Sequence, residues 1–171
     1  MAGKKVLNDK DSQVVKGSLG RRVARGLVLR DYRPADFPRL CQIDRRCFGP
    51  PLAYKAPDMA AFLRAPGAVT LVMEDSGRRV VAFLLAHRGH IITVDVLPGW
   101  RRRGLATALL SASERRLRAA GIRTLRLETA AANRAGQALY ESLGYTRVRR
   151  LARYYPDGQD AWVMEKRLVR A

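Results

Sequence analysis

The chain has 171 residues, 47% of them hydrophobic, and its 33 lysines and arginines against 15 acidic residues give a formal net charge of +18. This length suits one domain with a hydrophobic core and excludes two ordinary domains. No apolar run approaches the roughly 18–20 residues of a membrane-spanning helix, and the first residues lack the apolar segment of a secretory signal, so we expect a cytoplasmic protein with no membrane contact.

The order of the predicted elements indicates the fold class. Residues 1–25 carry seven lysines and arginines against two aspartates without sustained periodicity, which predicts a basic flexible arm. Residues 26–171 are expected to form the domain, with a strand at 26–32, a helix at 33–48, a Pro-rich loop at 49–57, a short helix at 58–65, strands at 68–75, 79–88 and 90–97, a helix at 105–120, a strand at 122–130, a helix at 133–144, and a closing hairpin of strands at 145–155 and 160–168. Strands and helices therefore alternate around one mixed sheet, which is an α/β or α+β single domain.

Four residues mark predicted helix ends. Asp58 is expected to cap the second helix and Asn133 the fourth, because both side chains accept hydrogen bonds from free helix amides. Gly121 and Gly144 are expected to end the third and fourth helices, because glycine adopts the left-handed conformation that follows many helices.

The cysteines and histidines do not indicate a metal site. Cys41 and Cys47 lie six residues apart in a predicted helix and point about 120° apart, so we expect free thiols. His87 and His90 flank a glycine without a cluster of cysteines or carboxylates, and we expect no bound metal.

The stretch WRRRGLATALL joins the strand at 90–97 to the helix at 105–120. Gly104 and Ala106 carry no bulky side chains, and the first amides of a helix have no intrahelical partners. Together with the helix dipole, such amides bind anions, and small residues let a pyrophosphate approach the backbone. The same spacing fits an ordinary turn with a solvated basic face, so the turn by itself leaves both interpretations open.

This turn and two later stretches together resemble a known family. The motif R-x-x-G-x-A that starts at Arg101 is similar to the signature of the GCN5-related N-acetyltransferases (GNAT). The stretches VDVLPGWRRRGLATALL, LRLETAAANRAGQALYESLGY and RYYPDGQDAWVM follow that family's order and spacing over residues 92–168, whereas residues 26–90 resemble it only in layout. The resemblance is greatest to the RimI-type and archaeal protein N-terminal acetyltransferases, which share LYESLGY and YY-x-DG-x-DA.

The resemblance implies a GNAT domain with acetyl-CoA as its cosubstrate. The backbone at residues 103–107 would hold the pyrophosphate. The cofactor-binding residues of the turn would be Arg101, Arg102, Arg103, Gly104, Leu105, Ala106 and Thr107. The arginine side chains would either assist with the 3′-phosphate or face solvent. The pantetheine arm would pair with the strand at 90–97, where a bulge would free the amide of Val94 or Val96 to bind the oxyanion. Asp95 alternates to the opposite side and either faces the substrate amine or ends a polar row.

Two further segments carry candidate catalytic residues. Asn133, Gln137 and Tyr140 recur at helical spacing on one face of the predicted fourth helix. The resemblance implies that Asn133 and Tyr140 contact the cofactor and that Tyr140 protonates the departing CoA thiolate, although a core aromatic also fits that position. The resemblance makes Glu128 the general base for the substrate amine; a structural ion pair with Arg126 on the same strand face is the alternative.

The predicted acceptor side lies in two loops. The resemblance implies that Tyr154 and Tyr155, before the Pro-Asp-Gly turn, contact the first peptide bond of a substrate; the same stretch fits a plain aromatic strand and turn. The opposite wall, CFGPPLAYKAP, departs from RimI-type sequences, which leaves the first residues of the acceptor undefined.

These observations support three hypotheses for the function. The first is acetyl transfer from acetyl-CoA to the N-terminal amine of a protein or peptide by direct attack in a ternary complex, since no cysteine or serine is placed as an acyl carrier. The second keeps the reaction with a small amine or a lysine as acceptor. The third is a nucleic-acid or ribosome-associated protein on the same scaffold, supported by the arm, the net charge and three late arginines, Arg147, Arg149 and Arg150. The basic surface is also compatible with an enzyme held near ribosomal RNA.

Overall fold

The computed structural model describes residues 21–22 and 26–168; the rest of the predicted basic arm lies outside the described residues. The elements, in chain order, are β1 (Arg21–Arg22), β2 (Val28–Asp31), a 3₁₀ turn (Pro34–Asp36), α1 (Phe37–Phe48), α2 (Ala56–Arg64), β3 (Ala68–Glu74), β4 (Val80–His87), β5 (His90–Val96), a second 3₁₀ turn (Pro98–Trp100), α3 (Leu105–Ala119), β6 (Thr124–Ala130), α4 (Arg134–Ser142), β7 (Thr146–Leu151) and β8 (Ala161–Arg167). Among the described residues, no helix is long and apolar enough to cross a membrane.

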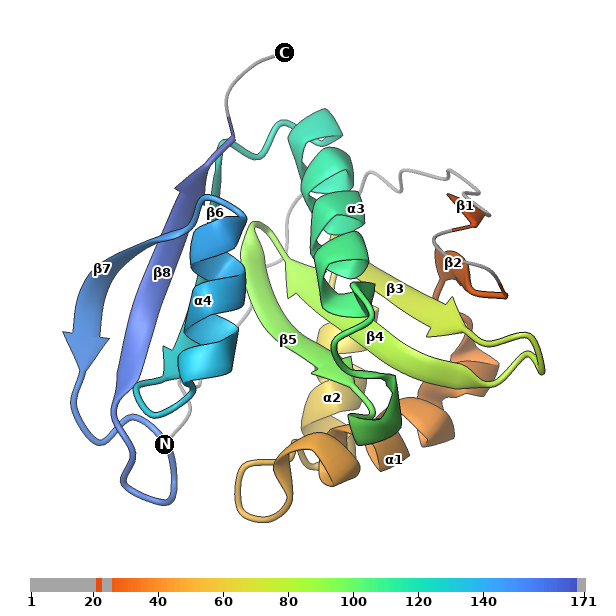
Figure 1. Cartoon of the computed structure of the whole chain (residues 1–171), viewed down its shortest axis with the longest axis horizontal. Coiled ribbons are helices and arrows are strands. Elements are labelled where there is room, and N and C mark those ends of the chain that lie inside the picture. Colours follow the sequence, from red (N-terminus) through yellow and green to blue (C-terminus); the bar gives the residue numbers. More distant parts are fainter. Residues whose placement is uncertain (1–20, 23–25, 169–171) are drawn as a thin grey trace.

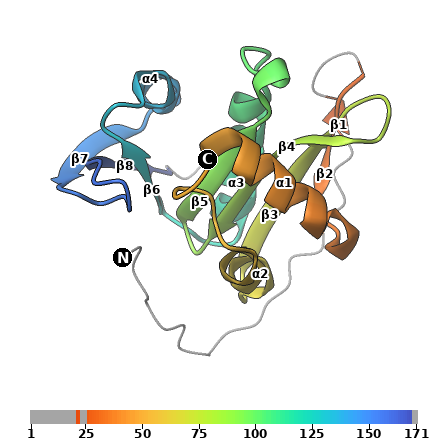
Figure 2. The ribbon, with the colours of Figure 1, turned by 90° about the horizontal axis from the view of Figure 1, so that it is seen from below.

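The eight strands of the described chain form one mixed sheet in the order β1-β2-β3-β4-β5-β6-β8-β7. All neighbouring strands run antiparallel except β5 and β6, which run parallel. Figures 1 and 2 show α3 and α4 over one face of the sheet and α1 and α2 over the other. Because helices cover β4 on both faces, its residues 80–86 are all buried, which explains their unbroken apolar sequence.

The two parallel strands meet at one position only. His90 of β5 is paired with Arg126 of β6, and the Arg126 amide donates to the Gly89 carbonyl at 2.8 Å. Gly89 has a φ of +86°, and a Cβ there would lie 2.6 Å from the Thr124 carbonyl oxygen. Glycine is therefore required at the point where the two halves of the sheet join. Beyond this point β5 and β6 separate, and each continues into a helix, α3 or α4 (Figure 1).

The predicted elements are confirmed with small shifts. Asn133 accepts a hydrogen bond from the Gly136 amide as the cap of α4, and Gly121 and Gly144 have the expected left-handed φ. The prediction for Asp58 is wrong, because α2 begins earlier, at Ala56, with a proline within its first turn, so that Asp58 lies inside the helix. The sheet also begins before residue 26, since β1 pairs with β2.

Candidate active site

The turn between β5 and α3 has the backbone that the sequence predicts. Gly104 is the residue before α3, with a φ of +78°, and the helix has no side-chain cap. A Cβ at Gly104 would meet nothing within 4 Å, so glycine is used here for its backbone conformation and for an open approach. The first amides of α3 therefore remain available to a ligand beyond the helix.

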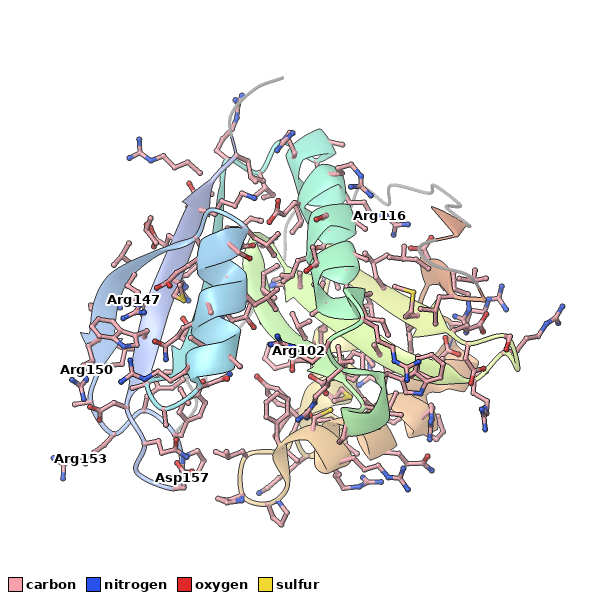
Figure 3. The ribbon with its side chains drawn as sticks, viewed as in Figure 1. Arg102, Arg116, Arg147, Arg150, Arg153 and Asp157 are labelled. Carbon is pink, nitrogen blue, oxygen red and sulfur yellow. The ribbon has the colours of Figure 1, made fainter. Side chains whose placement is uncertain are left out.

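The three arginines of this turn differ in their contacts. The Nε of Arg101 donates to the Val96 carbonyl at 3.1 Å, and the Arg103 guanidinium lies 5.0 Å from the centre of the Trp100 ring. Arg102 has a φ of +62° and lies beside the start of α3 (Figure 3). All three side chains are exposed, which is compatible with either of their predicted roles.

The backbone of β5 presents two amides to the side of β6. The Leu97 amide donates to the Val81 carbonyl of β4 at 3.1 Å, and successive residues of a strand direct their amides to opposite sides. In the register of β4 and β5, the amides of Val94 and Val96 therefore point away from β4. The predicted bulge occurs in this strand, but at Ile92 rather than beside the two valines. The geometry leaves both amides open to an acyl group.

Glu128 lies at the junction of β5 and β6, where a histidine and an arginine side chain approach it. Its Oε2 is 2.5 Å from the Nε2 of His90, and its Oε1 is 3.2 Å from the Nε of Arg126. The side chain is only 10% exposed. Burial raises its pKa, but the hydrogen bond with His90 and the charges of His90, Arg126 and Arg149 outweigh burial, so the pKa lies below its ordinary value. The carboxylate is ionised at neutral pH. The ion pair with Arg126 is present, and the role of Glu128 as a general base stays a prediction.

His90 is a site residue that the sequence analysis missed. An ionised carboxylate only accepts hydrogen bonds, so the Nε2 of His90 donates to Glu128, and in the neutral imidazole Nδ1 is the acceptor. The available signal was weak: His90 starts a strand, and Glu128 lies 38 residues later. Only the pairing of β5 with β6 brings the two side chains together.

Tyr140 has the properties of a proton donor. The side chain is half-buried, its hydroxyl has no hydrogen-bond partner within the described chain, and the centre of its ring lies 5.9 Å from that of Tyr145 in an edge-on arrangement. Burial is the main cause that raises its pKa to about 12. The phenol is therefore protonated at neutral pH.

Asn133 and Gln137 anchor α4 to the end of β6. Asn133 Oδ1 accepts from the Gly136 amide at 2.9 Å, and its Nδ2 donates to the Thr129 hydroxyl at 3.2 Å. Gln137 is buried and donates to the carbonyls of Ala130 and Ala131. Asn133 and Gln137 thus lie on one face of α4, as predicted, and Asn133 makes local hydrogen bonds. The contact of Asn133 with a cofactor stays a prediction.

Three tyrosines from two loops surround Glu128. Tyr154 and Tyr155 lie edge to face at 5.1 Å in the loop between β7 and β8, outside the strand that the sequence predicts for them. Tyr54, which the sequence analysis did not single out, comes from the loop after α1, and its hydroxyl donates to the Ile92 carbonyl at 3.5 Å. Burial raises the pKa of all three hydroxyls, and the Glu128 carboxylate raises each of them further. The two loops therefore meet beside this carboxylate.

Asp95 matches the second of its two predicted roles, because it ends a polar row that includes Thr93 on the same face of β5. It is fully buried, accepts a hydrogen bond from the Thr93 hydroxyl and faces α1 rather than a substrate or solvent. Cys41 and Cys47 are free thiols, as expected. Within the described residues, no group of three or more His, Cys, Asp or Glu side chains is placed to hold a metal ion.

Comparisons with known proteins agree with this geometry. A family model described as "Acetyltransferase (GNAT) family" matches residues 37–145. An N-alpha-acetyltransferase of Saccharolobus solfataricus is 38% identical over 85 residues, 49% of this chain and 51% of that protein, so the chain matches about half the length of this curated relative. An uncharacterized N-acetyltransferase of Methanocaldococcus jannaschii is 30% identical over 146 residues, 82% of this chain and 92% of that protein. The crystal structure of the ribosomal-protein-S18-alanine N-acetyltransferase from Escherichia coli superposes with a TM-score of 0.75 at 27% identity, covering 85% of this chain and 96% of that one.

Proposed function

The chain belongs to the acetyltransferase (GNAT) family, and on this basis we propose that it transfers the acetyl group of acetyl-CoA to the N-terminal amine of a protein or peptide. The observation that carries the proposal is the contact of His90 with Glu128, because these two side chains lie beside the open amides of β5 and between two tyrosine-bearing loops, where they would act as a proton-accepting pair. Relatives named N-alpha-acetyltransferase support the choice of acceptor.

The residues of the turn fit acetyl-CoA. The left-handed Gly104 and the uncapped start of α3 would hold the pyrophosphate on backbone amides, and β5 would hold the pantetheine arm beside Val94 and Val96. When bound, acetyl-CoA supplies a thioester whose carbonyl carbon is attacked by the amine. An amide of β5 would stabilise the negative charge that develops on the carbonyl oxygen.

His90 and Glu128 would remove the proton from the acceptor amine. Glu128 orients the imidazole through Nε2, which leaves Nδ1 to accept a proton from the ammonium group, directly or through a water molecule. An N-terminal ammonium has a pKa near 7.7–8.0, against about 10.4 for lysine, so the proton transfer is far easier for an N-terminus. This difference favours the α-amine over a lysine side chain.

Tyr140 would supply the proton for the leaving thiolate. Its phenol stays protonated at neutral pH and has no partner among the described residues that would compete for its hydrogen. No residue of the site is assigned to carry the acetyl group covalently, so we propose direct transfer within a ternary complex.

The test is acetylation of peptides that contain both a free N-terminus and an internal lysine, with the modified nitrogen identified by mass spectrometry. The first residue would be varied among Ala, Ser, Met and Glu, and Glu128→Gln would serve as the inactive control. Acetylation of the α-amine that is lost in the control supports the proposal. Acetylation of lysine alone, or tight acetyl-CoA binding with no peptide product, would direct attention to a lysine or a small amine as acceptor.

A second proposal concerns the basic surface: we propose that it holds the protein near ribosomes in the cytoplasm. The edge strand β7 is exposed, and Figure 3 places Arg147, Arg150 and Arg153 along its outer side and the following loop. Arg147 and Arg150 already pair with acidic side chains at 2.7 Å, so Arg149 and Arg153 would contribute most to a polyanion contact. Binding of ribosomal RNA that weakens steeply with salt supports this association, and binding that does not respond to salt contradicts it.

A further inference from the structure

Two aspartates lie buried against each other between α1 and β5. Asp44 of α1 and Asp95 of β5 are both 0% exposed. One oxygen of each has a donor: Asp44 Oδ2 accepts from the Tyr54 amide at 2.7 Å, and Asp95 Oδ1 accepts from the Thr93 hydroxyl. The other two oxygens, Asp44 Oδ1 and Asp95 Oδ2, have no donor among the described residues, while the two carboxyl groups lie within hydrogen-bonding reach of each other.

Two ionised carboxylates in this position would repel each other in a site that water does not reach. A proton between the two unpartnered oxygens removes the repulsion and supplies the missing hydrogen bond. Burial raises the pKa of Asp95 well above its ordinary value and that of Asp44 to about 6, so Asp95 is the partner that keeps the proton.

Among residues 21–22 and 26–168, no cation is placed to replace this proton. Arg45 and Cys47 approach the pair from α1, Tyr54 from the following loop, Arg101 from the turn after β5, and Tyr140 from α4. Arg101 acts on Asp95 only through its charge, because its Nε donates a hydrogen bond to the Val96 carbonyl. The neighbouring β4 contributes apolar residues, and α2 turns Met59 inward while its charged residues are exposed.

The pair connects the two sides of the candidate active site. Asp44 holds the loop that carries Tyr54, on the acceptor side, through that residue's backbone amide. Asp95 lies between Val94 and Val96, whose amides point away from β4 and would face the acyl group. A contact between the carboxyls therefore fixes the acceptor loop relative to the strand at which the reaction takes place.

We propose that Asp44 and Asp95 share one proton and that this pair positions the loop 49–55 on β5 for binding of the acceptor. The inference rests on the proposed function, because the loop forms one wall of the acceptor site only if the acceptor is a peptide. Neither aspartate touches the reacting atoms, so both are positioning residues. Loss of the shared proton at alkaline pH would separate the carboxyls and weaken acceptor binding without affecting the turn that holds acetyl-CoA.

The first test needs no activity. The full chain would be labelled with ¹³C at the aspartate carboxyls and titrated by NMR. One carboxyl resonance is expected to keep the shift of a protonated acid at about pH 7 and to be absent from Asp95→Asn. Full ionisation of every aspartate below about pH 5 would overturn the proposal, whether or not the protein acetylates peptides.

The second test uses steady-state kinetics of peptide acetylation from about pH 6.5 to about pH 9.5. In Asp95→Asn the amide donates to Asp44 at every pH, so this variant serves as the reference. The ratio of the wild-type KM for peptide to that of Asp95→Asn is expected to rise by about fivefold or more on the alkaline side. The KM for acetyl-CoA is expected to stay the same in both proteins. Titration of the peptide amine affects both equally and cancels in the ratio.

Two further variants complete the test. Asp95→Leu, which cannot donate, is expected to raise the KM for peptide about tenfold with kcat changed less than about twofold. The matched control Asp58→Asn, on the exposed surface of α2, is expected to change neither constant. A ratio of wild type to Asp95→Asn that is constant across pH, or an equal rise of both KM values in Asp95→Leu, contradicts a positioning role. Absence of any peptide acetylation rejects the proposed function, while the NMR titration still decides whether the proton is shared.

Discussion

The imidazole of His90 and the carboxylate of Glu128 meet at the single position where the two halves of the sheet are paired. β5 supplies the histidine and the open amides, and β6 supplies the carboxylate and leads into the helix that carries Tyr140. The site therefore depends on how these two parallel strands join and then separate.

The first prediction concerns this pair. Glu128→Gln and His90→Gln are each expected to lower kcat for N-terminal acetylation by about 100-fold, because each removes the same proton-accepting unit. The double variant is expected to lose little more than either single one, since residues that act as a unit are not additive. Arg126→Gln, which removes only the neighbouring cation, is expected to lower kcat a few-fold at most; an equal loss there would favour the structural ion pair as the role of Glu128.

The pH profile of the same reaction gives a second prediction. Because the pKa of Glu128 lies below its ordinary value, this carboxylate is ionised well below neutral pH and its protonation does not limit the rate there. Because the proposed pair takes a proton from the ammonium form of the peptide, the alkaline limb of kcat/KM is expected to follow the peptide amine, near pH 7.7–8.0. Peptides whose α-amine has a lower pKa should shift the limb with them; a limb that stays fixed for all peptides would assign it to the enzyme.

Tyr140→Phe provides a third prediction. Loss of the hydroxyl removes the proposed donor to the CoA thiolate and makes no difference to local hydrogen bonds, since none is formed within the described chain. We expect kcat to fall by about 10- to 100-fold with the Kd for acetyl-CoA unchanged in isothermal titration calorimetry. An unchanged kcat would identify Tyr140 as a packing residue only.

Glycine substitutions at both ends of α3 separate binding from stability. Gly104 and Gly121 have similar left-handed φ values, and a Cβ at either would meet nothing within 4 Å. Alanine at each should lower the free energy of unfolding by about 1–2 kcal/mol, measured with denaturant. Only Gly104→Ala is expected to weaken acetyl-CoA binding, because the distortion lies at the start of the helix; equal binding by both variants would contradict the pyrophosphate site.

The stability of Asp95→Asn should depend on pH in a defined direction. The pKa of Asp95 is raised in the folded protein, so from about pH 4 up to that raised value the folded state keeps a proton that the unfolded chain loses. Wild-type stability therefore falls over this range, and the asparagine variant lacks this loss. The melting temperature of the variant relative to wild type is expected to increase from about pH 5 to about pH 8; a constant or decreasing difference would show that Asp95 is ionised in the fold.

Local chemistry was sufficient to predict most of the fold. The apolar run of β4, the alternation of β6, the cap at Asn133 and the glycines after α3 and α4 each act over a few residues, and the structure confirms each of them. The same holds for the turn at Gly104, because a left-handed glycine before a helix is a local feature. The prediction that Asp58 caps α2 was wrong because the proline before it, which was assigned to the loop, lies in the first turn of the helix.

By itself, then, the sequence determined the order of the elements, the backbone of the turn at Gly104 and the identities of Glu128 and Tyr140 as candidates, since these follow from local spacing and from a resemblance. Only the tertiary structure decided which side chains meet: His90 with Glu128 across two parallel strands, Tyr54 with the loop of Tyr154, and Asp95 with Asp44 across a helix and a strand. The physical reason is that these contacts join residues far apart in the chain, and the register and separation of β5 and β6, which no local pattern encodes, bring them into reach.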